Sequence, residues 1–131
     1  MCKTISTLGM EHEKWLRLRK GGIGGSDAAA VCGLNPYRSP MAVYWEKTTD
    51  TLDLSDNEAM RQGRDLENYV AQRFTEETGK KVRRSNKMYW SEAHPFMYAD
   101  VDRLLVGEDA GLECKTVSAY NAGKWENGAI P

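Results

Sequence analysis

The chain has 131 residues, of which 40% are hydrophobic and 28% charged, as is typical of a single soluble globular domain. Its formal net charge of −1 gives no general basis for nucleic-acid binding, so any such site has to be local. The three widely spaced cysteines argue against a disulfide framework or a zinc ribbon, and the lack of a signal-peptide pattern or a long apolar run predicts a cytoplasmic protein without membrane spans.

The spacing of apolar and helix-capping residues predicts four helices in the first 79 residues. In chain order they are the segment 11–20, a short helix capped by Ser26 or Asp27 and ended by Gly33, a helix that begins at Ser39 and Pro40, and a long helix from the capping-box pattern SDNE (55–58) to about Thr78, with Gly79 as its stop.

The long helix carries an unusual carboxylate. Its apolar stripe, at helical spacing, consists of Ala59, Gly63, Leu66, Val70 and Phe74. Glu67 falls at the edge of this stripe and not on the opposite, solvated face. An acidic side chain in this position is a candidate for a site residue.

After the long helix the pattern changes to that of strands. Segments 81–90, 94–106 and 111–117 are rich in β-branched, aromatic and apolar residues. The turn sequence GEDAG at 107–111 predicts that the last two form a hairpin. Helices followed by a meander of strands indicate an α+β fold.

The last predicted strand gathers groups that can do chemistry. Alternate residues of a strand share a face, so Glu113 and Lys115 point one way while Leu112 and Cys114 point the other. The hairpin brings Asp102 close to the Glu113–Lys115 end.

The carboxylates of Asp102 and Glu113, with Glu67 from the long helix, provide oxygen ligands of the kind that Mg²⁺ or Mn²⁺ prefers. Lys115 could orient a metal-bound water or stabilise developing negative charge. The alternative is a cross-strand ion pair on an exposed face, which is common and contributes little.

The glycine-rich segment 19–33 (RKGGIGGSDAAAVCG) resembles a phosphate-binding loop but fits neither common type. No Gly-Lys-Ser/Thr follows, and Asp27 stands where a dinucleotide-binding loop needs its third glycine. The remaining possibility is an anion site made by Ser26 at a helix start, with Arg19 seven residues earlier as a second donor. The alternative is a simple turn and helix cap. The basic clusters at 17–20 and 80–84 are by default solvated surface.

Four stretches in this order resemble the phage lambda exonuclease family, in its YqaJ-like viral recombinase group of PD-(D/E)XK nucleases. They are RKGGIGGSDAAAVCGLNPYRSP (19–40), GRDLENYVAQRF (63–74), YADVDRLL (98–105) and GLECKT (111–116). The resemblance implies an α/β/α, restriction-endonuclease-like core with a mixed central sheet. It also implies a single nuclease domain over 1–131, and we expect the family's C-terminal helical segment to be absent from this chain.

The resemblance further implies a Mg²⁺-dependent 5′→3′ exonuclease acting on double-stranded DNA, with Mn²⁺ able to substitute. Asp102, Glu113 and Glu67 would form the acidic, metal-binding set and Lys115 would be the catalytic lysine. Asp100 is an alternative to Asp102, which we favour because it lies closest to the family's second strand. Arg19 and Ser26 would hold the terminal 5′ phosphate.

The partners implied by the resemblance are DNA ends, a phage single-strand annealing protein and two further copies of the chain in a ring-shaped homotrimer. The resemblance also implies that the chain is encoded by a phage or prophage and made in a bacterium. Two other functions stay open: a DNA-end-binding recombination module without turnover, and an endonuclease built on the same core.

Overall fold

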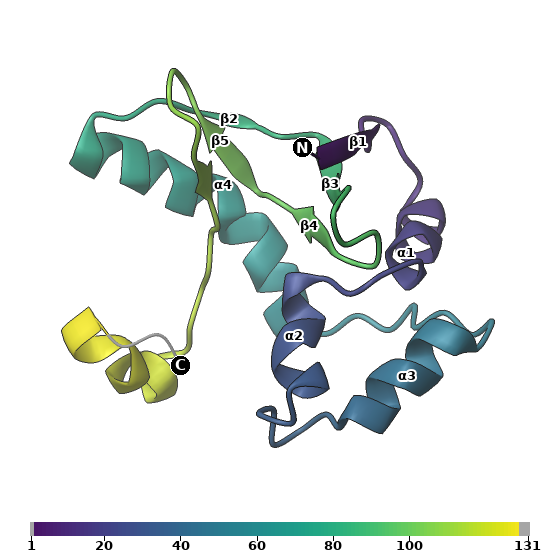
Figure 1. The fold of residues 1–131 in the computed structure, drawn as a ribbon. Helices are drawn as coiled ribbons and strands as arrows, with labels where there is room; N and C mark the ends of the chain where they lie inside the picture. Colours follow the sequence, from purple (N-terminus) through teal and green to yellow (C-terminus); the bar gives the residue numbers. More distant parts are fainter. Residues whose placement is uncertain (1, 129–131) are drawn as a thin grey trace. The chain divides into compact units, whose positions relative to one another are not determined.

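A computed structural model describes residues 2–128 (Figure 1). Contacts divide the chain into two compact units, each built from two separate stretches. The first unit comprises the residues up to Ser55 together with Ser85–Val101, and the second comprises Asp56–Arg84 together with the residues from Asp102 onward. The prediction of a single domain spanning 1–131 stays a prediction.

The first unit contains three helices and a three-stranded antiparallel sheet in the order β1-β3-β4. Its elements are β1 (Cys2–Ser6), α1 (His12–Lys20), α2 (Gly25–Val31), α3 (Pro40–Thr48), β3 (Lys87–Ser91) and β4 (Tyr98–Asp100). Its buried apolar residues are Ala30, Val43, Met88 and Tyr98. The strand β1 was not predicted.

Two of the three helix starts in this unit were predicted correctly. The helix α1 occupies nearly all of the predicted segment 11–20, and α3 begins with Pro40 after Ser39, whose Oγ accepts the Ala42 N–H at 3.1 Å. The cap predicted for α2 is wrong. Gly24 is the N-cap, and Asp27 sits inside the first turn with its carboxylate accepting the Gly24 N–H at 3.0 Å.

The second unit contains a long helix and a three-stranded antiparallel sheet in the order β2-β5-β6. Its elements are α4 (Glu58–Thr78), β2 (Val82–Arg84), β5 (Arg103–Leu105), β6 (Gly111–Leu112) and a 3-10 segment, η1 (Ala119–Gly128), interrupted at Glu126 and Asn127. Together the two units form an α+β fold, which confirms the predicted class. Within residues 2–128, no helix is both long and apolar enough to span a membrane.

The helix α4 ends as predicted, but its N-cap and its inward face differ. Asn57, not Ser55, is the N-cap, and its Oδ1 accepts the Met60 N–H at 2.9 Å; Gly79 ends the helix at φ +71°. Leu66 of the predicted stripe is exposed, whereas Glu67 is half-buried. The inward face includes Glu67 because Arg103 on β5 supplies its carboxylate with a partner.

The predictions of one continuous strand at 81–90 and one at 94–106 are wrong. Each is divided between the two sheets, into β2 and β3 and into β4 and β5. The two connections between the sheets also differ in length by one residue. Residues 85–87 connect Arg84 to Met88, whereas residues 101–102 connect their pairing partners Asp100 and Arg103. Asn86, at φ +50°, takes up the extra residue in a left-handed conformation.

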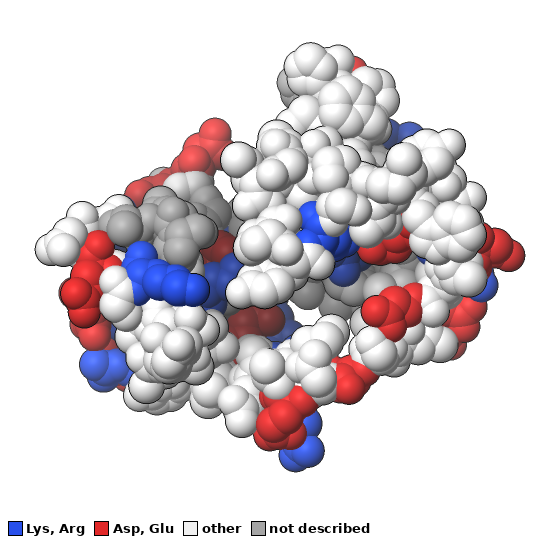
Figure 2. All heavy atoms as spheres, turned by 90° about the horizontal axis from the view of Figure 1, so that it is seen from below, with Lys and Arg blue, Asp and Glu red and all other residues white. Residues whose placement is uncertain are grey.

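Charges of both signs are distributed through the chain. On the face in Figure 2, basic and acidic residues lie interspersed among uncharged ones. This distribution agrees with the near-balance of 18 Lys and Arg against 19 Asp and Glu. A basic binding site therefore has to be identified residue by residue.

Candidate functional site

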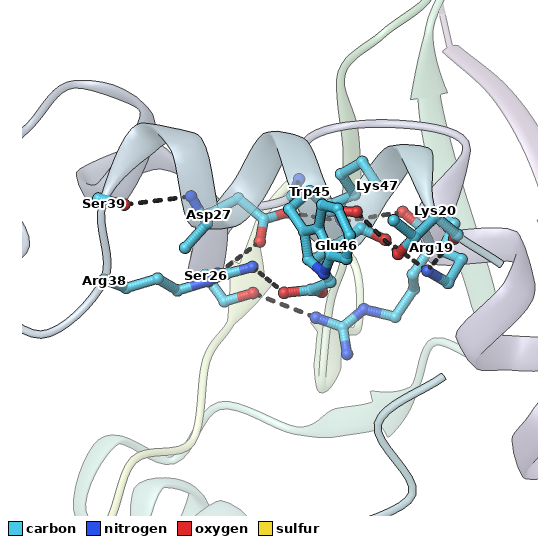
Figure 3. A network of polar contacts seen from close by, with 12 residues as sticks. Arg19, Lys20, Ser26, Asp27, Arg38, Ser39, Trp45, Glu46 and Lys47 are labelled. Carbon is cyan, nitrogen blue, oxygen red and sulfur yellow. Dashed lines mark hydrogen bonds and ion pairs between the residues drawn. The ribbon is translucent and has the colours of Figure 1, made fainter. Parts of the chain in front are cut away.

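The first group of candidate residues centres on Arg19, in the last turn of α1. Its Nη2 donates to Ser26 Oγ at 3.1 Å, and its Nε donates to the Tyr98 hydroxyl at 3.0 Å. Its guanidinium lies 4.4 Å from the centroid of the Trp15 ring, in cation–π geometry. The structure thus brings Arg19 and Ser26 together, and it fixes the guanidinium next to an exposed hydroxyl (Figure 3).

The glycines of this segment are required by packing. A Cβ on Gly24 would lie 2.7 Å from the Tyr98 ring and hydroxyl, and a Cβ on Gly22 would lie 2.7 Å from Trp90 and from the Phe96 carbonyl oxygen. Real Cβ atoms do not approach other atoms this closely. These two glycines therefore let the backbone lie against the aromatic residues of β3 and β4, including the tyrosine that holds Arg19.

Asp27 anchors the start of α2 and is only 2% exposed. Besides the Gly24 N–H, its carboxylate contacts Arg38 Nη1 at 2.8 Å and Lys47 Nζ at 2.9 Å (Figure 3). Burial alone would raise the pKa of Asp27, but the Gly24 N–H and the two cations outweigh burial and hold the pKa below its ordinary value. The residue acts as a buried anion that joins α2 to the α3 region.

The second group of candidate residues lies at the end of the β5–β6 hairpin. The β5–β6 backbone pairing stops at Leu112. Beyond it, the Cys114 N–H donates to the side-chain carboxylate of Asp102 at 2.7 Å. The predicted alternation continues past the strand, since Leu112 and Cys114 are half-buried while Glu113 and Lys115 are exposed. Glu113 Oε1 and Lys115 Nζ form an ion pair at 2.5 Å.

Glu67 reaches this hairpin through Arg103. The Arg103 Nη1 donates both to Glu67 Oε1 and, at 2.8 Å, to the carbonyl oxygen of Asp102. Arg103 is 4% exposed, and its Nη2 is buried without a hydrogen-bond partner. One arginine therefore connects the helix carboxylate with the backbone at Asp102.

The predicted acids of the second unit affect the pKa of the Cys114 thiol, which is raised above its ordinary value. Burial is the largest cause of the raised pKa of this thiol, followed by the negative charge of Asp102. Arg103 opposes the shift, whereas Glu67 and Glu113 add to it. All three carboxylates therefore contribute to the raised pKa of this one thiol.

The chemistry of these donors fits a hard divalent cation, because carboxylate oxygens are the ligands that Mg²⁺ prefers. In this arrangement, however, Glu67 is paired with Arg103 and Glu113 with Lys115. Across residues 2–128, no three His, Cys, Asp or Glu side chains are grouped so that they could hold a metal ion. Metal binding would need these carboxylates to turn from their cationic partners.

A comparison with known protein families covers nearly the whole chain. The profile of the YqaJ-like viral recombinase domain matches residues 14–131. The chain belongs to this family. The resemblance predicted from four sequence stretches is thereby confirmed.

A relative and a solved structure extend this assignment. "Uncharacterized protein YqaJ" of Bacillus subtilis (strain 168) is 44% identical over 123 residues, which are 93% of this chain and 39% of the relative. The crystal structure of LHK-Exo in complex with dAMP is similar with a TM-score of 0.61 at 26% identity, over 77% of this chain and 51% of that one. The YqaJ-like chain thus spans well under half of one and about half of the other.

Sequence reasoning missed two residues that organise the sites of this YqaJ-like chain. Tyr98 holds Arg19, and Arg103 pairs with Glu67. Arg103 could have been found, because it is a basic residue inside the apolar strand segment that follows Asp102. Tyr98 could not, because only the fold brings it next to residues 79 positions earlier.

Proposed function

We propose that this chain is the nuclease portion of a Mg²⁺-dependent exonuclease that hydrolyses double-stranded DNA from its 5′ end in phage-type recombination. The observation that carries the proposal is the placement of Asp102, Glu113 and Lys115 at the end of one hairpin, with Glu67 linked to it through Arg103. Membership of a viral recombinase family and likeness to an exonuclease structure support the same reading.

In this proposal Asp102 and Glu113, with Glu67, hold the Mg²⁺ ion, and Mn²⁺ can substitute. When bound, the ion would polarise the phosphodiester and lower the pKa of a water molecule. Lys115 is exposed and can turn from Glu113 to the reacting phosphate, where its ammonium would stabilise developing negative charge. The Cys114 N–H keeps the Asp102 carboxylate in place by donating a hydrogen bond to one of its oxygens.

Arg19 and Ser26 are proposed to bind the terminal 5′ phosphate. Arg19 is held by Tyr98 through Nε and by Ser26 through Nη2, while its Nη1 has no partner among the described residues. A fixed guanidinium beside an exposed hydroxyl suits a phosphoryl group, because both donate to its oxygens. Binding of the 5′ phosphate would set the direction of digestion.

The proposed partners are DNA ends, a single-strand annealing protein and two further copies of the chain in a homotrimer. Phage or prophage origin and a cytoplasmic setting belong to the same proposal. Light scattering coupled to size exclusion tests the trimer directly, because three copies have three times the 14.8 kDa mass of the chain.

The decisive experiment is digestion of a linear, 5′-phosphorylated duplex in the presence of Mg²⁺. We expect mononucleotide release, reduced about a hundredfold or more by Lys115→Ala because one preorganised donor to the reacting group is lost. Lys80→Ala is the matched control, since Lys80 is also an exposed lysine in an ion pair, with Glu108. Equal rates for the two variants would contradict the role of Lys115.

A covalently closed circle separates the alternatives. It stays intact with an exonuclease and is cut by an endonuclease of the same core. A third possibility, a DNA-end-binding module without turnover, would hold if Glu67 and Glu113 keep their cationic partners when DNA is bound. Such a module would bind a duplex end and release no nucleotides.

The phosphate role of Arg19 has its own test. We expect Arg19→Gln to reduce the preference for a 5′-phosphorylated over a 5′-hydroxyl duplex by roughly tenfold, because a charge-assisted contact is lost. Arg17→Gln, on the same helix, removes an exposed arginine that pairs with Glu13 and should keep the preference. A parent chain that digests both duplexes at one rate would show that this site holds no 5′ phosphate.

A further inference from the structure

A surface pocket of about 250 Å³ lies in the second unit, between α4 and the strands β2 and β5. Its polar lining includes Asn68 and Gln72 from the helix and Arg83, Arg84 and Arg103 from the strands. None of the described residues that line it carries a carboxylate. Pockets for drug-sized ligands are larger, roughly 300–1,000 Å³, so this one suits a small anionic group.

Two of the three arginines that line this pocket have no ionic partner among the described residues. Arg84 lies directly opposite Arg103 in the β2–β5 ladder, where like charges are destabilising. Glu67 pairs with Arg103, but the Arg83 and Arg84 guanidinium groups have no hydrogen bond or ion pair with another described residue. An anion between the strands and the helix would relieve this repulsion.

Arg103 gives a second and independent indication. Its Nη2 is buried and lacks a hydrogen-bond partner, which is costly for a charged group. Arg103 also lines the pocket. A bound oxyanion offers the acceptor that this nitrogen lacks, because phosphate oxygens accept hydrogen bonds from guanidinium groups in a bidentate manner.

We infer that this pocket binds a phosphoryl group, held mainly by Arg84 and Arg103 with Arg83 at its edge. The inference goes beyond the proposed nuclease function and does not need turnover, since Arg83 and Arg84 have no part in the proposed chemistry. The phosphoryl group has two sources of the same chemistry: a backbone phosphate of nucleic acid, or a free phosphate.

The test measures binding by titration calorimetry in EDTA, so that nuclease activity plays no part. Inorganic phosphate is titrated into the parent chain, Arg84→Gln and Arg73→Gln. Arg73 is the matched control, because it is an exposed arginine of α4 whose charge is already paired with Glu76 and Glu77. We expect Arg84→Gln to weaken phosphate binding roughly tenfold or more, and Arg73→Gln to leave it within about twofold.

A second arm replaces phosphate with a short duplex at several salt concentrations. If the pocket takes a backbone phosphate, Arg84→Gln should reduce the slope of log affinity against log salt by about one, and Arg73→Gln should not. A slope unchanged by Arg84→Gln, together with weaker inorganic phosphate binding, would assign the pocket to a free phosphate.

The inference would be overturned if the parent chain shows no saturable phosphate binding, or if Arg84→Gln and Arg73→Gln bind phosphate equally. Arg83→Gln is a second pocket variant and should show a smaller loss. Arg83 and Arg84 are both exposed, so these variants should keep the parent's far-ultraviolet circular dichroism. Loss of nuclease activity with intact phosphate binding would concern the proposed function alone.

Discussion

At the scale of single residues, the carboxylates of Asp27 and Asp102 have different roles. Asp27 is buried and fully engaged with one backbone N–H and two cations, so it serves the fold. Asp102 uses one oxygen for the Cys114 N–H and lies in the hairpin with the candidate catalytic residues. The sequence alone does not indicate which of the two aspartates is structural. The role of Asp27 depends on Arg38 and Lys47, which lie 11 and 20 residues further along the chain.

Replacement of Asp27 by Asn should therefore destabilise the chain by about 3 kcal/mol, because two cations lose a buried anion. Its effect should depend on pH. The folded state lowers the pKa of Asp27 below 3.8, so its contribution is fully present above that value and disappears as the pH falls through the folded pKa. Denaturant unfolding of parent and variant between pH 7 and strongly acidic pH measures both effects.

The control for this prediction is Asp50→Asn, which removes a 3.3 Å ion pair between Arg17 and a carboxylate that is 99% exposed. Its cost should be below about 1 kcal/mol. A difference between parent and Asp27→Asn that stays constant down to the most acidic conditions would contradict the assigned role.

At the scale of elements, the connection from α1 to α2 depends on glycine at particular positions. Gly24 lies against the Tyr98 ring, whereas Gly25 has no atom within 4 Å of the place where a Cβ would be. Gly24 is therefore required for close packing, whereas nothing in the structure requires a glycine at position 25. A sequence pattern with glycines alone cannot separate them.

We expect Gly24→Ala to destabilise the chain by about 1–3 kcal/mol, because the methyl group would displace the Tyr98 ring. Gly25→Ala should be neutral or stabilising by up to about 1 kcal/mol, because it restricts the unfolded chain at a helical position with free space. Thermal unfolding of the two variants provides the comparison. Equal losses would show that Tyr98 moves away without cost.

At the scale of the whole molecule, the sequence predicted the presence of the helices and, among the strand pairs, the β5–β6 hairpin, but not the division of the strands between two sheets. Helix ends are coded locally, by Ser39 with Pro40 and by Gly79, and these predictions are confirmed. The division of each long strand depends on pairing with distant segments, such as β1 with β3, and no local pattern encodes it. For the site, the proximity of Asp102 to Glu113 followed from the hairpin. Arg103 stands out in the sequence, but its pairing with Glu67 is seen only in the fold.

Each unit is built from two stretches that alternate along the chain with those of the other unit. We therefore expect that a chain ending at Arg84 does not fold cooperatively. It keeps β1 without its partner β3, and β2 without its partner β5. A chain ending at Ser118 keeps the strands β1 to β6 and should still unfold in a single denaturant transition. Circular dichroism during urea titration measures this difference, and a sigmoidal transition of the shorter chain would disprove the prediction.

The one-residue register shift between β2–β5 and β3–β4 has a consequence for chain length. Residues 85–87 and 101–102 form connections that differ by one residue, and the two ladders keep their separate registers because of this difference. Deletion of Asn86 would make the connections equal and place both ladders in a common register, with one set of side chains turned to the wrong face. Insertions and deletions in this short segment should therefore be tolerated far less than substitutions at the exposed Asn86.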